Sequence, residues 1–330
     1  MTGARSTMRA RAGALARLLE GRVSGAWNRV RRASVVLLYH RVADGPSDPW
    51  SLCVRPAHFR EQMAVLARRR VVPLDALADD VGTGRRRRSI AVTFDDGYAD
   101  FAAAALPILR SHGIPATLFV ASGILDDEAE FWWDELERIV LAGPPAPERL
   151  ELAIGGARFA WLAPRDGDRR ALYLALHRAL GRVDGATRAA ALRDLRAWAR
   201  VGAARRESHR PLRADEVAAV GRDPLVRVGA HSVSHAYLTA LADAAQRAEI
   251  VDSKRRLEAI VGRPVDHFSY PHGDHAPATV AHVRAAGFRV ACDTEAAPVT
   301  AGADVLALPR VEVPDLAGPA FARWLAQWGG

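Results

Sequence analysis

The sequence predicts an α/β fold in which about seven βα units form a barrel with a mainly helical insertion. Two observations lead to this prediction. Short apolar, β-branched segments alternate with helix-period stretches along most of the chain, which is typical of a parallel sheet covered by helices. Several of the apolar segments also end in ionisable residues, and the functional groups of parallel barrels collect where the strands end.

The predicted strands are apolar runs rich in Val, Ile, Leu and Phe, a composition that favours buried strands. In chain order they are 34–39, 89–94, 116–120, 225–230, 267–270, 289–293 and 305–313. Helix-period patterns lie between them, most clearly at 56–70, 99–113 and 242–262. Residues 34–330 are therefore predicted to form one barrel domain, preceded by a basic arm at 1–33.

An insert at about 143–222 interrupts the alternation of strands and helices. It begins with GPPAP and continues with alternating apolar positions on either side of Gly155 and Gly156, which predicts a hairpin with a two-residue turn. Ala/Arg/Leu-rich helical patterns follow. We expect this insert to form a helical cap beside the mouth of the barrel.

The composition limits the classes of function. With 330 residues and 49% hydrophobic content, the chain can bury a large core. The net charge of +8 comes from 45 arginines and one lysine, Lys254, which are scattered along the chain and resemble a coding bias. The run RRRR at 85–88 is short, and no motif interleaves arginine with aromatic residues. We therefore expect no nucleic-acid partner. Two distant cysteines, Cys53 and Cys292, imply no disulfide framework.

The arm at 1–33 is rich in Ala and Arg and has no uninterrupted apolar run. It is therefore predicted to be neither a secretory signal nor a transmembrane span, and the protein is expected in the cytoplasm. Two interpretations of the arm stay open. It is either a basic amphipathic helix lying peripherally on the inner membrane face, or a solvated helical arm.

Residues 93–98, TFDDGY, place two adjacent carboxylates, Asp95 and Asp96, directly after an apolar run. Adjacent carboxylates repel each other unless a cation lies between them or one of them takes up a proton. A metal ion would remove the repulsion. The alternative is an ordinary turn at an Asp-Gly pair, which needs no chemistry.

His231 and His235 are four residues apart, so on a helical turn their imidazoles project from one face. Together with a carboxylate from another strand end, they supply two nitrogens and one oxygen, and open positions remain for water and substrate. Zn²⁺ is the default ion for this set, while Co²⁺, Ni²⁺, Mn²⁺ or Fe²⁺ also fit. If one of Asp95 and Asp96 binds the ion, the other can accept a proton from the water that the ion activates.

Three segments in this order, TFDDGY (93–98), GAHSVSH (229–235) and FSYPHG (268–273), resemble the polysaccharide deacetylases, also called the NodB-homology domain or carbohydrate esterase family four. The resemblance extends from about Val35 to about Val313, without the insert. It implies a distorted barrel of about seven βα units. It also implies a metal-dependent hydrolase that removes N-acetyl groups from amino sugars of a glycan, such as an exopolysaccharide.

The resemblance also implies roles for individual residues. Asp95 corresponds to the catalytic base, and Asp96, His231 and His235 correspond to the metal ligands. The third segment would line the groove beside the base, and the backbone N–H of His272 would bind the oxyanion.

The chain departs from the family pattern at three places. Ser269 stands where the family has an arginine that pairs with the base, no Asp-Trp motif is found near 292–298, and Arg310 stands where a histidine acid is usual. We hypothesise that Arg310 replaces the missing arginine and fixes the ionised base, and that His40 or His272 donates the proton to the leaving amine. A strand-end histidine bonded to backbone is the alternative for His40.

Aromatic residues near the strand ends have two interpretations each. Tyr98 and Tyr270 are candidates for stacking on a sugar ring, with core packing as the alternative. Trp132 and Trp133 are interpreted as core or groove wall and not as catalytic residues.

Two other functions are consistent with the same residues. A catalytically weak glycan-binding homologue could keep the metal pocket, although binding alone would not need the base. An iron-dependent oxygenase could use the same ligand trio, although the adjacent carboxylate favours hydrolysis. The substrate is expected to be an N-acetylated glycan, either a lipid-linked precursor at the inner membrane face or an oligosaccharide in solution.

Overall fold

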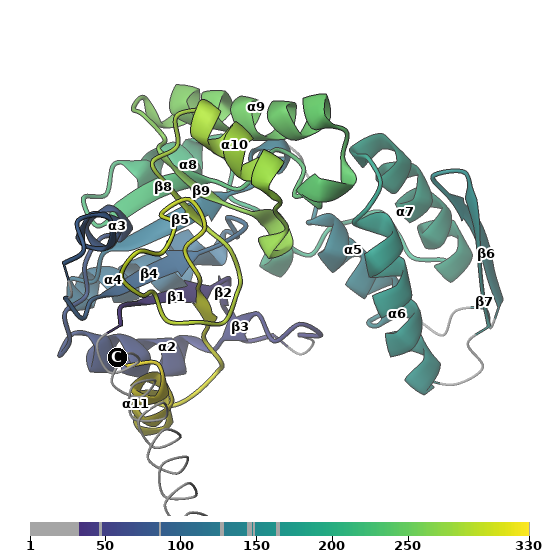
Figure 1. Ribbon diagram of the computed structural model, residues 1–330. Helices are drawn as coiled ribbons and strands as arrows, with labels where there is room; N and C mark the ends of the chain where they lie inside the picture. Colours follow the sequence, from purple (N-terminus) through teal and green to yellow (C-terminus); the bar gives the residue numbers. More distant parts are fainter. Residues whose placement is uncertain are drawn as a thin grey trace, which may run out of the picture.

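A curled parallel sheet forms the centre of the computed structural model (Figure 1), which describes residues 33–45, 48–85, 87–125, 129–143, 147, 149–162 and 166–329. The predicted basic arm thus lies outside the described residues, apart from Ala33. All seven predicted strands are confirmed, and they pair in the order β10-β9-β8-β5-β4-β1-β11. They are β1 (Val35–Tyr39), β4 (Ile90–Phe94), β5 (Ala116–Val120), β8 (Val226–Ala230), β9 (His267–Ser269), β10 (Val290–Cys292) and β11 (Val311–Glu312).

One segment contacts both edges of this sheet and so closes the distorted barrel. Leu308 pairs with Cys292 at the end of β10, and its N–H donates to the carbonyl of Ala291 at 2.9 Å. Three residues later, Val311 in β11 is already paired with β1. The chain therefore crosses from one sheet edge to the other between residues 308 and 311. Arg310 lies in this crossing and has no exposed surface.

Helices cover the outside of the sheet (Figure 1), as the alternating pattern predicts. Four of them have proline at the first or second helical position, where its missing N–H costs nothing. α4 and α9 end at Gly113 and Gly262, which adopt left-handed conformations with φ of 62° and 68°. The helices are α2 (Pro56–Leu66), α3 (Leu74–Gly82), α4 (Leu106–His112), α8 (Ala214–Gly221), α9 (Asp243–Val261), α10 (Pro277–Ala285) and α11 (Gly318–Gln327).

The inner strands are buried along their whole length. Every residue of β1, β4 and β5 is buried, because helices pack on one side of the sheet and the barrel interior lies on the other. Phe94, the last residue of β4, packs against Phe59 of α2 and Phe101. Burying such a ring contributes about 1.5–3 kcal/mol, so the end of β4 is firmly placed. Asp95 and Asp96 follow directly.

The insert forms a second unit with its own core beside the barrel (Figure 1). The predicted hairpin is confirmed: β6 (Arg149–Ile154) and β7 (Ala157–Leu162) are antiparallel, and Ile154 pairs with Ala157. Gly155 and Gly156 form the two-residue turn with φ of 58° and 81°, which side chains with a Cβ adopt at a cost. Two helices follow, α6 (Asp166–Leu180) and α7 (Gly185–Ala199).

The helical unit does not coincide with the predicted insert of 143–222. It begins earlier, because α5 (Trp132–Val140) contributes Trp133 and Leu136 to the core that α6 and α7 share. It also ends earlier, because Val217 and Val220 of α8 are part of the barrel core. The apolar periods of α5 and α8 do not show which of two cores they enter, which is why the sequence misplaces the boundary.

One small two-stranded sheet was not predicted. β2 (Arg41–Val42) pairs with β3 (Cys53–Val54) next to the end of β1. This pairing places the connecting loop, which contains Trp50, beside the insert, where the Trp50 indole donates to the Tyr173 hydroxyl at 2.6 Å.

In the described part of the chain, no helix has the length and apolarity needed to cross a membrane.

Candidate active site

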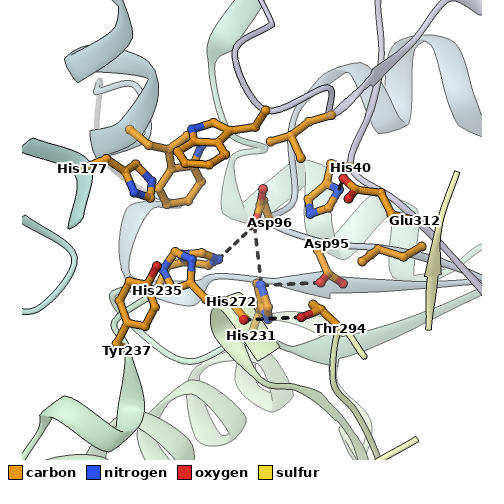
Figure 2. A pocket seen from close by; sticks show the side chains of 14 residues that line it. His40, Asp95, Asp96, His177, His231, His235, Tyr237, His272, Thr294 and Glu312 are labelled. Carbon is orange, nitrogen blue, oxygen red and sulfur yellow. Dashed lines mark hydrogen bonds and ion pairs between the residues drawn. The ribbon is translucent and has the colours of Figure 1, made fainter. Parts of the chain in front are cut away.

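The predicted site residues come together at the ends of the strands. Asp95 and Asp96 follow β4, His231 and His235 follow β8, and His272 follows β9. Figure 2 shows the two imidazoles of the HSVSH segment directed at Asp96, with Asp95 next to them. The convergence arises because the carboxyl ends of parallel strands meet at one end of a barrel.

Asp96, His231 and His235 form a compact set of buried donor atoms, all within 4.8 Å of one another. The Asp96 Oδ1 atom lies 3.5 Å from His231 Nε2 and 3.3 Å from His235 Nε2. Two ligands of one tetrahedral zinc ion, bound at about 2.0–2.1 Å, lie about 3.3–3.4 Å apart. The same Oδ1 atom is buried without a hydrogen-bond partner, which is costly unless something else satisfies it. The donor set therefore fits a divalent cation.

The orientation of His231 is fixed by the backbone of β9. Its Nδ1 lies 2.8 Å from the carbonyl oxygen of Ser269. Because a carbonyl only accepts hydrogen bonds, Nδ1 carries the proton and Nε2 presents its lone pair to Asp96. This is the tautomer that a metal ligand needs, and such outer partners are a regular part of metal sites.

The segment between the two histidines is held from both sides. On the barrel side, the carboxylate of Glu249 in α9 accepts hydrogen bonds from the N–H groups of Val233 and Ser234 and from the Ser234 hydroxyl, at 2.7–2.8 Å. On the insert side, Arg188 of α7 donates to the Ser234 carbonyl at 3.2 Å. Arg188 also lies over the Trp132 ring, 4.8 Å from its centroid. The insert thus supports the position of His235.

Asp95 is paired with Arg310, as hypothesised from the sequence. The guanidinium donates two hydrogen bonds to the carboxylate, at 2.7 Å and 2.6 Å, and both side chains are buried. Ser269 takes part as well: its hydroxyl accepts from Arg310 at 2.7 Å and donates to Asp95 at 3.1 Å. Ser269 stands where the family has an arginine that pairs with the base. Arg310, from the crossing segment, makes that pairing here.

The charges of the site favour two ionised carboxylates. Burial by itself raises the pKa of Asp95, but Arg310 and His231 lower it more, so the net shift of this pKa is downward. Burial also raises the pKa of Asp96. Hydrogen bonds from His231 and His235, formed when their Nε2 atoms carry protons, bring this pKa well below its ordinary value. Asp95 Oδ2 lies 3.7 Å from His231 Nε2. An ionised carboxylate therefore stands beside the donor set without being part of it.

Backbone strain is concentrated in this region. Six non-glycine residues of the described chain have positive φ, and four of them belong to the site: Asp96 (74°), Ser232 (60°), His235 (53°) and His272 (58°). Such conformations cost of order 1–3 kcal/mol each and persist where the surrounding structure enforces them. Gly273 follows with φ of 68°, and a Cβ there would lie 2.1 Å from Thr294 Oγ1. The strand-end loops are thus built to hold these side chains in place.

A pocket of about 340 Å³ opens above the carboxylates, which is within the size range of small-molecule sites. The barrel and the insert both line it. The predicted residues His40, Asp95, Asp96, His231, His235 and His272 are in its wall, together with Trp50, Trp133, His177, Tyr237 and Glu312. The insert thus touches the pocket through Trp133 and His177, and Trp133 is groove wall, one of its two predicted interpretations.

His40 and His272 occupy different sides of the pocket. Figure 2 shows His40 near Asp95 and Glu312, and His272 near His235 and Tyr237. The His272 ring is stacked on Tyr237 with centroids 3.9 Å apart, and burial lowers the pKa of His272 well below its usual value. His40 Nδ1 is buried without a hydrogen-bond partner, which disfavours the alternative of a ring nitrogen bonded to backbone.

The two tyrosines do not line the pocket, so the structure favours core packing for both. Tyr270 is fully buried, and its hydroxyl donates to the Leu306 carbonyl at 2.8 Å. Tyr98 is also buried; its hydroxyl donates to Asp134 at 2.7 Å and accepts from the Trp133 indole. The expectation that they stack on a sugar is therefore corrected, because neither ring faces the pocket. Tyr98 instead supports Trp133 from behind.

Several residues of the pocket were missed from the sequence. Trp50 lies in a loop without periodic pattern, His177 is one residue of an Ala/Arg/Leu helix, and Glu312 lies in the two-residue strand β11. Trp50 and His177 contact each other with ring centroids 4.7 Å apart. Of these three, Glu312 alone is the last residue of a strand, so its position carried a signal that the sequence could have revealed.

A buried carboxylate paired with arginine lies beside a two-histidine, one-carboxylate set at the mouth of a parallel barrel. This arrangement is the one expected of a hydrolytic α/β-barrel enzyme. The family follows from the sequence. Residues 82–145 and 197–291 match the family model described as polysaccharide deacetylase, and the gap between them falls in the helical unit. The chain belongs to the polysaccharide deacetylase family and is a hydrolytic enzyme.

Solved structures show the same fold. The deacetylase PplD of Streptococcus pyogenes has a TM-score of 0.55 at 16% identity, covering 90% of this chain and 98% of that one. IcaB from Ammonifex degensii has a TM-score of 0.58 at 18% identity, with 90% and 97% covered. BC0361, a polysaccharide deacetylase from Bacillus cereus, has a TM-score of 0.57 at 18% identity, with 90% and 69% covered. Among curated proteins, no significant match is found.

Proposed function

We propose that the protein is a metal-dependent hydrolase that removes N-acetyl groups from amino sugars of a polysaccharide or glycan precursor. The main support is the arrangement of Asp95: it is ionised, held by Arg310, and adjacent to a set of donors that includes an unsatisfied buried oxygen of Asp96. A protein that only bound glycans would have no use for a base in this position.

Asp96, His231 and His235 would hold the cation, with Zn²⁺ as the default because two donors are imidazole nitrogens and one is a carboxylate oxygen. When bound, a divalent ion polarises an amide carbonyl and lowers the pKa of water. The lone pair of His231 is directed to this position by the Ser269 carbonyl.

The side chains around the donor set would then carry the proton transfers. Asp95 accepts a proton as the water oxygen attacks the acetyl carbon, and Arg310 keeps the carboxylate ionised and oriented. The backbone N–H of His272 donates to the carbonyl oxygen as it gains charge. The C–N bond breaks, acetate is released, and the amine nitrogen receives a proton from His40.

His40 is the proposed donor for a geometric reason. It lies on the Asp95 side of the pocket, with its Nδ1 atom 3.9 Å from the Glu312 carboxylate. The ring of His272 is instead confined between Tyr237 and His235, at centroid distances of 3.9 Å and 4.5 Å. His40→Gln is expected to lower kcat about 10²–10⁴-fold. His272→Gln keeps the backbone N–H and is expected to have a smaller effect. If His272→Gln lowered kcat more than His40→Gln, the proton donor would be His272 instead.

The function is tested by measuring acetate release from chitooligosaccharides and other acetylated glycans, with chelator and with defined metals added back. We expect acetate release that stops with chelator and returns with Zn²⁺ or a similar ion. Asp95→Asn is the matched control, because it removes the base and leaves the donor set intact. Metal and glycan binding without acetate release in the unsubstituted protein would instead indicate the weak glycan-binding homologue.

A further inference from the structure

The end of the barrel opposite the pocket carries an arginine cluster that the proposed function does not use. Six arginines are exposed there: Arg68, Arg69 and Arg70 after α2, and Arg85, Arg87 and Arg88 before β4. We call these six residues the basic face. The two segments lie side by side, since the Ile90 N–H donates to the Arg70 carbonyl at 2.9 Å and Arg70 Nε donates to Ser89 Oγ at 2.9 Å.

The basic face is poorly neutralised. Arg70 lies 3.4 Å from Asp80, and Arg88 donates to the Gly329 carbonyl. Within the described residues, the guanidinium groups of the other four arginines form no ion pair or hydrogen bond. Elsewhere in the molecule, arginines such as Arg206 are bound by carboxylates. Like charges gathered without counter-charges repel each other, so this face is suited to an anionic partner.

Aromatic residues adjoin the same face. The Arg88 side chain contacts the carbonyl of Gly329, directly after Trp328 of the C-terminal segment. Trp324 and Trp328 are half-buried, with ring centroids 6.3 Å apart. Indoles next to arginines are typical of surfaces that lie at the boundary between water and lipid.

The segment 1–32 joins the molecule at this face. Ala33 lines a hollow of about 340 Å³ together with Arg69, Arg70, Arg88 and Gly329. Residues 1–32 contain eight arginines and one glutamate, a net charge of +7 (8 − 1). Their apolar residues Leu15, Leu18, Leu19, Val23 and Trp27 have the spacing of one face of a helix. That pattern is typical of segments that lie in a membrane interface. The segment is joined to the basic face through Ala33, and its net charge has the same sign as that face.

We propose that the basic face docks on an anionic phospholipid membrane and turns the catalytic pocket away from it. Ile90, next to the basic face, begins β4, and Asp95 follows the end of this five-residue strand, so the two ends are separated by about 15–20 Å. Figure 1 shows the C-terminus at the end of the barrel remote from α6 and α7 of the insert. The docked enzyme would act on glycan extending into water rather than on a sugar held at the lipid headgroups. The docking itself does not rest on the proposed function.

The test is sedimentation of the full chain with vesicles of phosphatidylcholine, with and without phosphatidylglycerol. The variant replaces the unpaired members of the basic face by glutamine: Arg68→Gln, Arg69→Gln, Arg85→Gln and Arg87→Gln. The control makes the same charge change on other surfaces: Arg158→Gln, Arg193→Gln, Arg200→Gln and Arg247→Gln, all at exposed positions. Circular dichroism and acetate release from a substrate in solution verify that each variant is folded.

We expect binding only to vesicles with phosphatidylglycerol, and weaker binding at high salt. Each arginine near an anionic surface contributes about fivefold to the partition coefficient, so the basic-face variant, which lacks four of them, should lose about 600-fold and the control much less. Equal losses in both variants, or none in either, would overturn the proposal. So would tighter binding of the unsubstituted protein to duplex DNA than to the anionic vesicles. Acetate release in solution should be unchanged, so failure of the docking and failure of the deacetylation are distinguishable.

Discussion

Replacing Arg310 by methionine removes the partner of the proposed base with little change in side-chain volume. The guanidinium donates hydrogen bonds to Asp95, to the Ser269 hydroxyl and to the Asp293 carbonyl at 2.6–2.8 Å, and it has no contact with solvent. Removing one member of a buried ion pair costs about 3–5 kcal/mol, because the other charge stays buried without compensation. We expect a loss of this size in the free energy of unfolding.

The assay is urea unfolding of Arg310→Met, Asp95→Asn and the double variant. The interaction energy from this cycle should be on the order of 2–3 kcal/mol, since removing both charges relieves most of the penalty of removing one. Arg210→Met is the matched control: Arg210 binds Glu216 in the same two-bond geometry, at 2.7 Å and 2.8 Å, but both side chains are about one fifth exposed. That pair should contribute about 1 kcal/mol or less.

The pH dependence gives a second readout. Burial raises the pKa of Asp95 and Arg310 is the largest opposing influence, so without the guanidinium this pKa rises and the acidic limb of kcat/KM moves to higher pH. In the unsubstituted protein the pair contributes its full stability above the unfolded-state pKa of about 3.9, and loses it as the pH falls through the lower folded-state pKa. Equal costs for Arg310→Met and Arg210→Met, or strictly additive energies in the cycle, would refute the assignment of Arg310.

Further predictions concern single residues. Asp96→Asn should keep the left-handed backbone, because Asn tolerates it. The variant should bind metal at least about 100-fold more weakly, a larger loss than is usual when a residue that only supports a ligand is removed. Metal content after dialysis measures this, and unchanged content would exclude Asp96 as a ligand. Burial lowers the pKa of His177 to about 4, so the unfolded chain binds more protons between pH 4 and 6.5, and acidification over this range should cost on the order of 3 kcal/mol. His177→Phe should flatten that dependence in urea titrations at several pH values, and a slope as steep as before would argue against it. Tyr270→Phe should lose about 1 kcal/mol of stability with unchanged kcat/KM, whereas a loss of activity would place the ring at the substrate.

The strands and the central residues were predictable because each carries a local signal. Buried parallel strands appear as apolar runs, and the end of a run marks where polar groups gather; this is how Asp95, Asp96, His231 and His235 were found. Arg310 was identified from its place in the last predicted strand, 305–313, although in the structure it lies just before β11. Its contact with Asp95 depends on the crossing between the sheet edges, which no local pattern shows.

Other features depend on tertiary packing that the sequence does not display. Trp50 and His177 enter the pocket because the insert packs against the loop before β3, and neither lies in a motif. Tyr98 and Tyr270 follow strand ends like Asp95 and His231, but their rings turn into apolar cores. An aromatic side chain fits both a pocket and a core, so position alone could not decide between them.

The place of Arg310 has a consequence for biosynthesis. Ribosomes deliver the barrel strands from β1 to β10 before they deliver the segment that spans the two sheet edges. Until that segment emerges, Asp95 lacks its guanidinium partner, although the residues that surround the donor set are already made. The nascent chain therefore becomes competent for chemistry only after nearly all of it has been translated, and premature termination before residue 310 leaves a product with an uncompensated acid at its centre.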